Sequence, residues 1–229
     1  MNNMKKTLIA LVTLGALGIG GFLLYFYVIR ADAPSELAAN DLDNALGTSA
    51  GAVDIGDPSG TWALTSDSTL GYRVKEVLGG LDTEGAGRTN DAVGSLTIDG
   101  SKATAAEFTV QMASMKSDSD RRDGQFRGRI MTVDQFPTAT FVLTQPIDFG
   151  AVPAAGIDVT ASATGDLTLR GVTKSVTFDL QAKVDNGKIG VLGQIPILFS
   201  DFEIPDPSNG FAVVKDNGLL EFVLVFDRA

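Results

Sequence analysis

Apolar and polar side chains alternate along most of the chain after residue 60. Phe108 and Val110 alternate with polar neighbours, and Leu220, Phe222 and Leu224 do the same near the carboxyl end. A period of two predicts half-buried β-strands, and about eight strands fit into this region. Tight turns are expected where glycine follows a small polar residue, because such pairs adopt positive φ angles readily. These pairs are Asp99-Gly100, Asn186-Gly187 and Asn217-Gly218.

The stretch GDLTLRGVTKSVTF, Gly165 to Phe178, contains two such strands with very few residues between them. Leu167 and Leu169 share one face before the turn, and Val176 and Phe178 share one face after it. The pattern predicts a hairpin whose turn and surface include Arg170 and Lys174.

One segment departs from the strand pattern. Residues 117–137 are rich in charge and poor in β-branched side chains. Ser119 or Asp120 is a suitable N-cap for a helix through Arg121 to Arg129, which buries Phe126 and Ile130 on one face. The residues therefore predict a mainly β domain, an antiparallel barrel or sandwich with one short helix.

The amino-terminal segment has a different character. Lys5 and Lys6 precede an uncharged run from Thr7 to Ile29, long enough as a helix to cross a hydrocarbon core of roughly 30 Å. The run is longer than the apolar core of a usual signal peptide, which favours an uncleaved transmembrane anchor. Ala31-Asp32-Ala33 matches a cleavage pattern, so a cleaved signal peptide stays an alternative.

The predicted organisation has three parts. Residues 1–30 are an anchor or signal segment, residues 31–59 are a flexible linker, and residues 60–229 are the β domain. The linker is rich in Ala, Asp, Gly and Ser and contains no aromatic residue. Because basic residues tend to stay on the cytoplasmic side, Lys5 and Lys6 predict a single-pass cell-membrane protein whose domain is exported, extracellular or periplasmic.

Composition excludes several classes of function. The chain has no cysteine and no histidine, which removes disulfides, imidazole-liganded metals and a Ser-His-Asp relay. Beyond residue 30, 15 basic residues stand against 28 acidic ones, a net charge of −13 that repels nucleic acid. No catalytic residue, metal site or cofactor is predicted, and an acid/base enzyme without histidine is the least favoured reading.

Two features leave alternatives open. The strand LLEFVLVF is apolar on both faces, which suits an apolar cavity but is also common in a packed core. The acidic and basic residues between Asp118 and Arg127 suit either a polar cavity mouth or the start of a helix, and the helix start is the favoured interpretation.

Five motifs in order make residues 62–226 resemble the YceI-like family of polyisoprenoid-binding, lipocalin-like barrels. The motifs are Ser68 with Tyr72 and Val74, Arg122-Asp123, Phe136-Pro137 with Ala139 and Phe141, Gly165 to Lys174 with Val176, and Phe199-Ser-Asp-Phe202 with Ile204. The resemblance implies an eight-stranded antiparallel barrel with one short helix beside it, and a long isoprenoid or quinone chain in an apolar tunnel. Glu76 and Glu203 stand where this family often has histidine and glycine.

These observations lead to a first hypothesis of a membrane-tethered lipid-binding barrel that sequesters, stores or transports an isoprenoid or similar apolar chain. Arg122 and Asp123 are candidates for orienting a head group or closing the mouth. The alternative is a solidly packed barrel that acts as a surface or stress-related interaction module, and a homodimer is left open. The apolar candidates for ligand contact are Phe108, Val110, Met112, Phe141, Leu143, Leu167, Leu169, Phe178, Leu180, Phe222 and Leu224.

Overall fold

A computed structural model describes residues 21, 33–47, 55–210 and 212–229. The predicted anchor therefore lies outside the described residues, apart from Gly21. In the described part of the chain, no helix is long and apolar enough to cross a membrane. Residues 33–229 form one compact unit.

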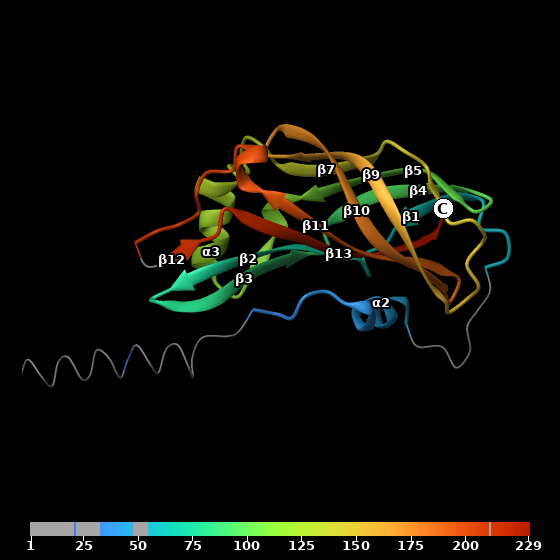
Figure 1. Ribbon diagram of the computed structural model, residues 1–229, viewed down its shortest axis with the longest axis horizontal. Coiled ribbons are helices and arrows are strands. Elements are labelled where there is room, and N and C mark those ends of the chain that lie inside the picture. The colour runs from blue at the N-terminus through green and yellow to red at the C-terminus, as the bar shows by residue number, and fades with distance from the viewer. Residues whose placement is uncertain (1–20, 22–32, 48–54, 211) are drawn as a thin grey trace, which may run out of the picture. The chain divides into compact units, whose positions relative to one another are not determined.

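Thirteen strands form a single sheet, and eight of them close into an antiparallel barrel (Figure 1). The ring follows the order β1-β4-β5-β7-β9-β10-β11-β13 and closes where β13 pairs with β1. Its strands are β1 (Gly60–Leu64), β4 (Ala92–Asp99), β5 (Lys102–Gln111), β7 (Thr138–Leu143), β9 (Asp158–Leu169), β10 (Val172–Asp185), β11 (Lys188–Leu198) and β13 (Asn217–Arg228). The mainly β, eight-stranded barrel is thus confirmed.

The long strand β13 has two neighbours on one edge. Its later residues, Phe226 to Arg228, pair with β1, whereas Leu219 to Val223 pair with β2. A branch of the sheet continues from there through β3 to β6. The remaining strands are β2 (Thr69–Leu78), β3 (Leu81–Thr89), β6 (Lys116–Ser117), β8 (Ile147–Asp148) and β12 (Ala212–Val214).

The hairpin predicted between Gly165 and Phe178 is present. β9 and β10 pair over their length, and the turn consists of Arg170 and Gly171, both with positive φ. Asn186-Gly187 likewise forms the turn between β10 and β11. The prediction for Asn217-Gly218 is wrong: these residues begin β13 and pair with Leu198 and Ile197 of β11, so the chain turns before them.

The predicted short helix is α3 (Asp120–Gln125), which continues as a wide turn, η3 (Phe126–Ile130). The Ser119 hydroxyl accepts a hydrogen bond from the Arg122 backbone N–H, as an N-cap does. Phe126 is buried and Ile130 is partly buried. Short single turns also occur at η2 (Met112–Ser114) and η4 (Phe199–Phe202).

The prediction of a flexible linker is wrong for residues 33–47, which we call the strap. The strap contains helix α2 (Ala39–Leu46), which packs on the outer side of β11 and β13. Leu37, Leu42 and Leu46 are buried there against Val223 and Val225. Burying these three leucines stabilises the ordered strap, which the Ala-rich and Asp-rich composition did not indicate.

Charged side chains of the barrel form hydrogen bonds with the backbone of the first residues of the strap. The buried Glu221 carboxylate of β13 accepts a hydrogen bond from the Leu37 backbone N–H, at 3.1 Å. The same carboxylate pairs with Arg73 at 3.4 Å and with Arg88 at 3.0 Å. These two arginines also donate to the carbonyl oxygens of Pro34 and Ser35. The strap is therefore fixed to β2, β3 and β13.

Candidate functional site

Strand alternation gives β13 two different faces. Leu220, Phe222, Leu224 and Phe226 point into the barrel, whereas the residues between them lie under the strap. Both faces are therefore covered, which explains why this strand is apolar on both sides.

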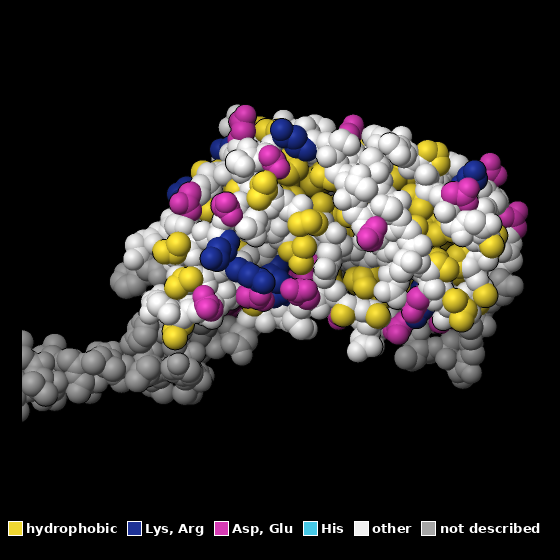
Figure 2. All heavy atoms as spheres, viewed as in Figure 1, with side chains coloured by type: hydrophobic (Ala, Val, Ile, Leu, Met, Phe, Trp, Pro, Cys, Tyr) yellow, Lys and Arg dark blue, Asp and Glu magenta, His cyan; other side chains and the backbone are white. Residues whose placement is uncertain are grey.

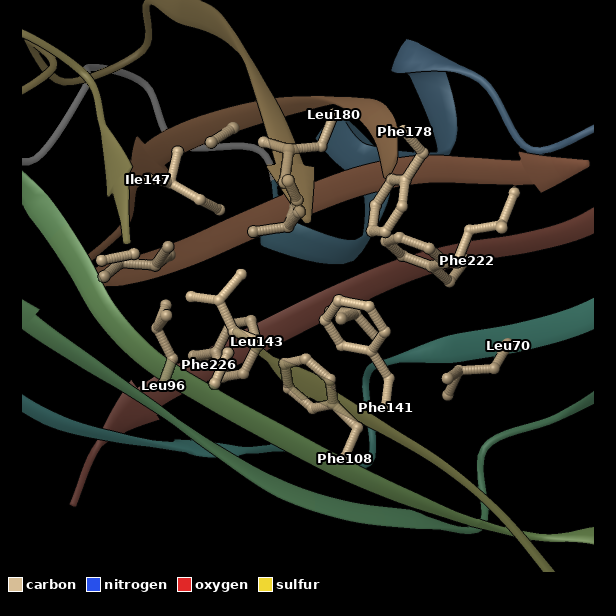
Figure 3. A pocket seen from close by; sticks show the side chains of 18 of the residues that line it. Leu70, Leu96, Phe108, Phe141, Leu143, Ile147, Phe178, Leu180, Phe222 and Phe226 are labelled. Carbon is tan, nitrogen blue, oxygen red and sulfur yellow. The ribbon is translucent and has the colours of Figure 1, made fainter. Parts of the chain in front are cut away.

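The barrel interior contains an apolar cavity of about 190 Å³ (Figure 3). In Figure 3 aromatic and aliphatic side chains from opposite walls converge on this space. Among the described residues that line it, only Ser101, Thr140 and Lys183 carry polar side chains. Its apolar lining includes Leu70, Leu96, Ile98, Ala106, Phe108, Phe141, Leu143, Ile147, Phe178, Leu180, Phe222 and Phe226.

Aromatic rings form a connected wall of this cavity. The Phe141 ring centroid lies 5.6 Å from that of Phe178, which lies 5.8 Å from that of Phe222, and both pairs meet edge to face. Phe108 lies 5.8 Å from Phe226. Edge-to-face contacts restrict how rings can move, so this wall is shaped before any ligand arrives.

Two glycines make room for these rings. A Cβ atom added at Gly165 would lie 2.3 Å from the Phe141 ring, and one added at Gly193 would lie 2.3 Å from the Phe222 ring. Each ring therefore lies flat across the backbone of the neighbouring strand. The sequence analysis did not identify either glycine as part of the site, because the contact depends on the pairing of β7 with β9 and of β11 with β13.

The interior is hollow rather than filled. Phe108, Phe141 and Phe222 face inward, yet their side chains are only partly buried. An inward side chain of a closed barrel that keeps accessible surface must border empty space. This observation disfavours the alternative of a solidly packed barrel.

All eleven apolar candidates from the sequence lie in the lining of this cavity. The lining also contains residues that the sequence analysis missed. Phe149 and Pro153 belong to the loop between β8 and β9, and Leu70 belongs to β2. Loop residues follow no period of two, so alternation gave no signal for them.

Arg122 and Asp123 do not line this cavity. Asp123 is the buried residue of α3, and it accepts hydrogen bonds from the Ser117 backbone N–H and hydroxyl at 2.8 and 2.7 Å. Burial alone raises the pKa of Asp123, but these hydrogen bonds, with Lys116, bring that pKa below its usual range. Asp123 therefore fixes the start of α3, in agreement with the structural interpretation of this charge cluster.

Arg122 borders a second cavity of about 100 Å³, beyond the first along β2. Leu70 on β2 lines the first cavity, and Tyr72, Val74 and Glu76 on the same face of that strand line the second. The Tyr72 ring stacks on Phe126, with centroids 5.0 Å apart. Arg122 pairs with Glu76 at 3.2 Å and with Asp118.

The two positions that differ from the family pattern have distinct surroundings. Glu76 belongs to the second cavity, whereas Glu203 ends η4 with a φ of 51°. That left-handed conformation favours glycine, so Glu203 departs from the pattern at a position where the backbone itself prefers glycine. Among the described residues no group of three or more acidic side chains is placed to hold a metal ion.

Comparisons with known proteins agree with this architecture. The sequence model of the YceI-like domain matches residues 62–226. A UPF0312 protein of Pseudomonas putida strain W619 is 39% identical over 95 residues, which cover 40% of this chain and 46% of that protein. A UPF0312 protein of Pseudomonas savastanoi pv. phaseolicola is 32% identical over 130 residues, covering 53% of this chain and 64% of the relative. The chain thus matches about half to two thirds of the length of these relatives.

Two solved structures share the fold. The polyisoprenoid binding domain from Saccharophagus degradans superposes with a TM-score of 0.60 at 19% identity, covering 73% of this chain and 98% of that domain. Burkholderia cenocepacia BcnA gives a TM-score of 0.54 at 24% identity, covering 69% of this chain and 95% of that protein.

Proposed function

Because the chain belongs to the YceI-like domain family, we propose that it is a membrane-tethered, extracytoplasmic binding protein for an isoprenoid or similar lipid. The observation that carries this proposal is the hollow apolar interior. A space of about 190 Å³ is smaller than the roughly 300–1,000 Å³ of usual ligand pockets, so it suits a slim chain better than a bulky ring system. The description of the Saccharophagus degradans relative as a polyisoprenoid binding domain supports this ligand class.

Binding requires no chemical step. A chain that enters the barrel leaves water and contacts the aromatic wall of Phe108, Phe141, Phe178 and Phe222, which contributes roughly 25 cal/mol for each Å² of apolar surface removed from water. Part of this gain is offset by the lost freedom of the chain, so the preshaped wall favours affinity. We expect sequestration, storage or transport of the ligand rather than its conversion.

The experiment blocks the cavity with a single side chain. Ala106 of β5 lines the cavity, whereas Ala105, its neighbour in sequence, is exposed on the outer side. The full chain is purified as wild type, Ala106→Phe and Ala105→Phe, and the organic extract of each is analysed by liquid chromatography and mass spectrometry. We expect about one apolar chain per protein in wild type and Ala105→Phe, and an at least tenfold loss in Ala106→Phe.

Two results contradict the proposal. One is a wild-type protein that carries no apolar chain and also fails to bind added polyprenol or quinone at micromolar concentration. The other is equal lipid content in Ala106→Phe and Ala105→Phe. If Ala106→Phe does not fold, the measurement with added polyprenol or quinone on the wild-type protein still shows whether the barrel binds an apolar chain.

The membrane tether is tested separately. We expect the full chain to stay in the membrane fraction after a carbonate wash, and its barrel to be digested by protease added to the outside of spheroplasts. Release by carbonate together with loss of residues 1–33 supports the alternative of a cleaved signal peptide. Protection of the barrel from external protease contradicts export.

A further inference from the structure

Two lysines lie opposite each other on the outer face of β2 and β12. The strands are antiparallel, and the Lys215 backbone N–H donates to the carbonyl oxygen of Lys75 at 2.9 Å. Both side chains are exposed. The carboxylate opposite Lys75 on the next strand belongs to Glu84, which pairs with Arg73 at 2.9 Å. Like charges directly opposite each other on neighbouring strands repel, so an anion bound between the two ammonium groups would relieve this repulsion.

The other lysines of the domain are mostly paired. Seven lysines follow residue 33. Four of them form ion pairs with carboxylates, namely Lys102, Lys116, Lys183 and Lys188. Lys75 and Lys215 are two of the remaining three, and neither is in an ion pair with a described residue. These two ammonium groups are therefore free to meet an external anion.

Two valines accompany these lysines. Because side chains alternate along a strand, Val77 shares the face of Lys75, and Val213 shares the face of Lys215. Val213 is 62% exposed, and the opposite face of both strands lines the second cavity. At the β2 and α3 end, Figure 2 shows basic side chains grouped together, with hydrophobic and acidic ones beside them. We call Lys75, Val77, Val213 and Lys215 the basic face.

The strap leads toward the basic face. Followed back from α2, it first contacts Glu221 of β13 through the Leu37 backbone N–H, and then Arg73 of β2 through the Pro34 carbonyl oxygen. Arg73 lies two residues before Lys75, so both belong to the same outer face of β2. The first residues of the strap are therefore held beside the basic face.

The predicted membrane span ends only a few residues before this point. Ile29 is the last residue of the uncharged run, and position 34 is five residues further along the chain. A fully extended chain covers at most about 3.6 Å per residue, so these two positions are separated by at most about 18 Å. The membrane anchor of the proposed function would therefore keep the basic face close to the bilayer surface.

Resting on that anchor, we propose that the basic face is a docking surface for anionic phospholipids of the same membrane. Lys75 and Lys215 bind headgroup phosphates, and Val213 enters the interface between headgroups and acyl chains. Beyond residue 30 the chain has 15 basic against 28 acidic residues, so an anionic bilayer repels most of its surface. Attraction at the basic face and repulsion elsewhere together determine which side of the barrel is turned toward the membrane.

The absence of cysteine allows this orientation to be measured with single labels. Full-length Val213→Cys and Val142→Cys each carry one bimane label. Val142 is the matched control, a 42% exposed valine on β7, across the ring from β13. Both proteins are reconstituted into phosphatidylcholine vesicles containing about one third phosphatidylglycerol, and quenching by a lipid with a nitroxide on its headgroup is recorded. We expect quenching at position 213 to be at least threefold stronger than at position 142.

Lipid charge and protein charge are then varied separately. The excess quenching at position 213 should disappear in vesicles of phosphatidylcholine alone. Lys75→Glu should reduce it at least twofold in anionic vesicles. Lys174→Glu changes the net charge equally, at an exposed lysine of β10 that has no ion pair with a described residue, and should leave it unchanged.

The outcomes separate this inference from the proposed function. Equal quenching of the two labels in anionic vesicles overturns the docking surface. An excess that persists in neutral vesicles, or that Lys75→Glu and Lys174→Glu reduce equally, overturns it as well. In each case the proposed function stands as long as carbonate leaves the full chain in the vesicles. Release by carbonate contradicts the anchor itself, and the docking surface with it.

Discussion

At the scale of single residues, the most constrained side chain is Glu221. Its carboxylate is fully buried between two guanidinium groups and also accepts a hydrogen bond from the strap. Buried charges are tolerated when several partners satisfy them, and removing one partner leaves the others uncompensated. The strap and the barrel wall therefore depend on one ionised group.

We expect Glu221→Gln to lower the free energy of unfolding by about 3 kcal/mol, because it leaves Arg73 and Arg88 without their shared counter-charge. Urea titration of the full chain measures the change. Glu36→Gln, an exposed position in the same strap, is the matched control and should change stability by less than about 0.5 kcal/mol. Equal effects of the two substitutions would show that the buried carboxylate has no special role.

Asp123 gives a prediction about pH. Because its folded pKa lies below the usual value, its contribution to stability is present above the unfolded pKa of about 4 and is lost as pH falls through the folded pKa. Wild type should thus exceed Asp123→Asn in stability most strongly above about pH 5, and the difference should shrink toward pH 3. Urea titrations at several pH values test this, with the exposed Asp120→Asn as control. A difference that does not depend on pH would assign the effect to packing.

At the scale of elements, the strap behaves as part of the barrel. Leu42 of α2 has no exposed surface, and its methyl groups lie where a side chain at position 190 would otherwise be, since a Cβ on Gly190 would come within 2.6 Å of Leu42. Its neighbours are Val223 and Val225, on the strand whose opposite face lines the cavity. The strap thus packs against the outer face of the strand whose inner face forms part of the cavity wall.

We expect Leu42→Ala to destabilise the full chain by about 2–4 kcal/mol, the usual range for a fully buried leucine. The control is Asn40→Ala, an exposed position on the same helix. The comparison uses urea unfolding followed by far-ultraviolet circular dichroism. A cost below about 1 kcal/mol would mean that the strap is only loosely attached.

The sequence predicted the elements of the barrel well and the strap poorly, for a physical reason. Alternation depends only on local sequence, so it identified inward candidates such as Phe141 and Leu180. The strap depends on partners distant in sequence, such as Leu37 with Glu221, and its own composition is polar. The second cavity was missed for the same reason, since it forms only when β2, α3 and η4 come together.

At the scale of the whole molecule, the barrel closes through a short strand pairing between β1 and β13, which we call the seam. β9 and β10 pair through twelve residues of each strand, whereas β1 pairs with only three residues of β13. Arg228 reinforces the seam, because it donates to the carbonyl oxygens of Ser59 and Asp57 and lies over the Trp62 ring at 4.8 Å. Local opening should begin where pairing is shortest.

Hydrogen exchange followed by mass spectrometry tests this order. We expect amides of β1 to exchange at least tenfold faster than those of β9 and β10, and Arg228→Ala to accelerate exchange in β1 specifically. Lys174→Ala, on the β9–β10 hairpin, serves as a control that should leave the seam unchanged. Faster exchange in the hairpin than in β1 would contradict the proposed order of opening.

The position of β13 has a consequence for how the protein is made. This strand contacts β1, β2, β11 and the strap, so each of these elements lacks one of its neighbours until residues near 228 have emerged. During synthesis the strap leucines and the open edges of β1 and β11 stay exposed, and such surfaces are prone to aggregation. We therefore expect a chain truncated before β13 to be found in aggregates rather than as a partial barrel.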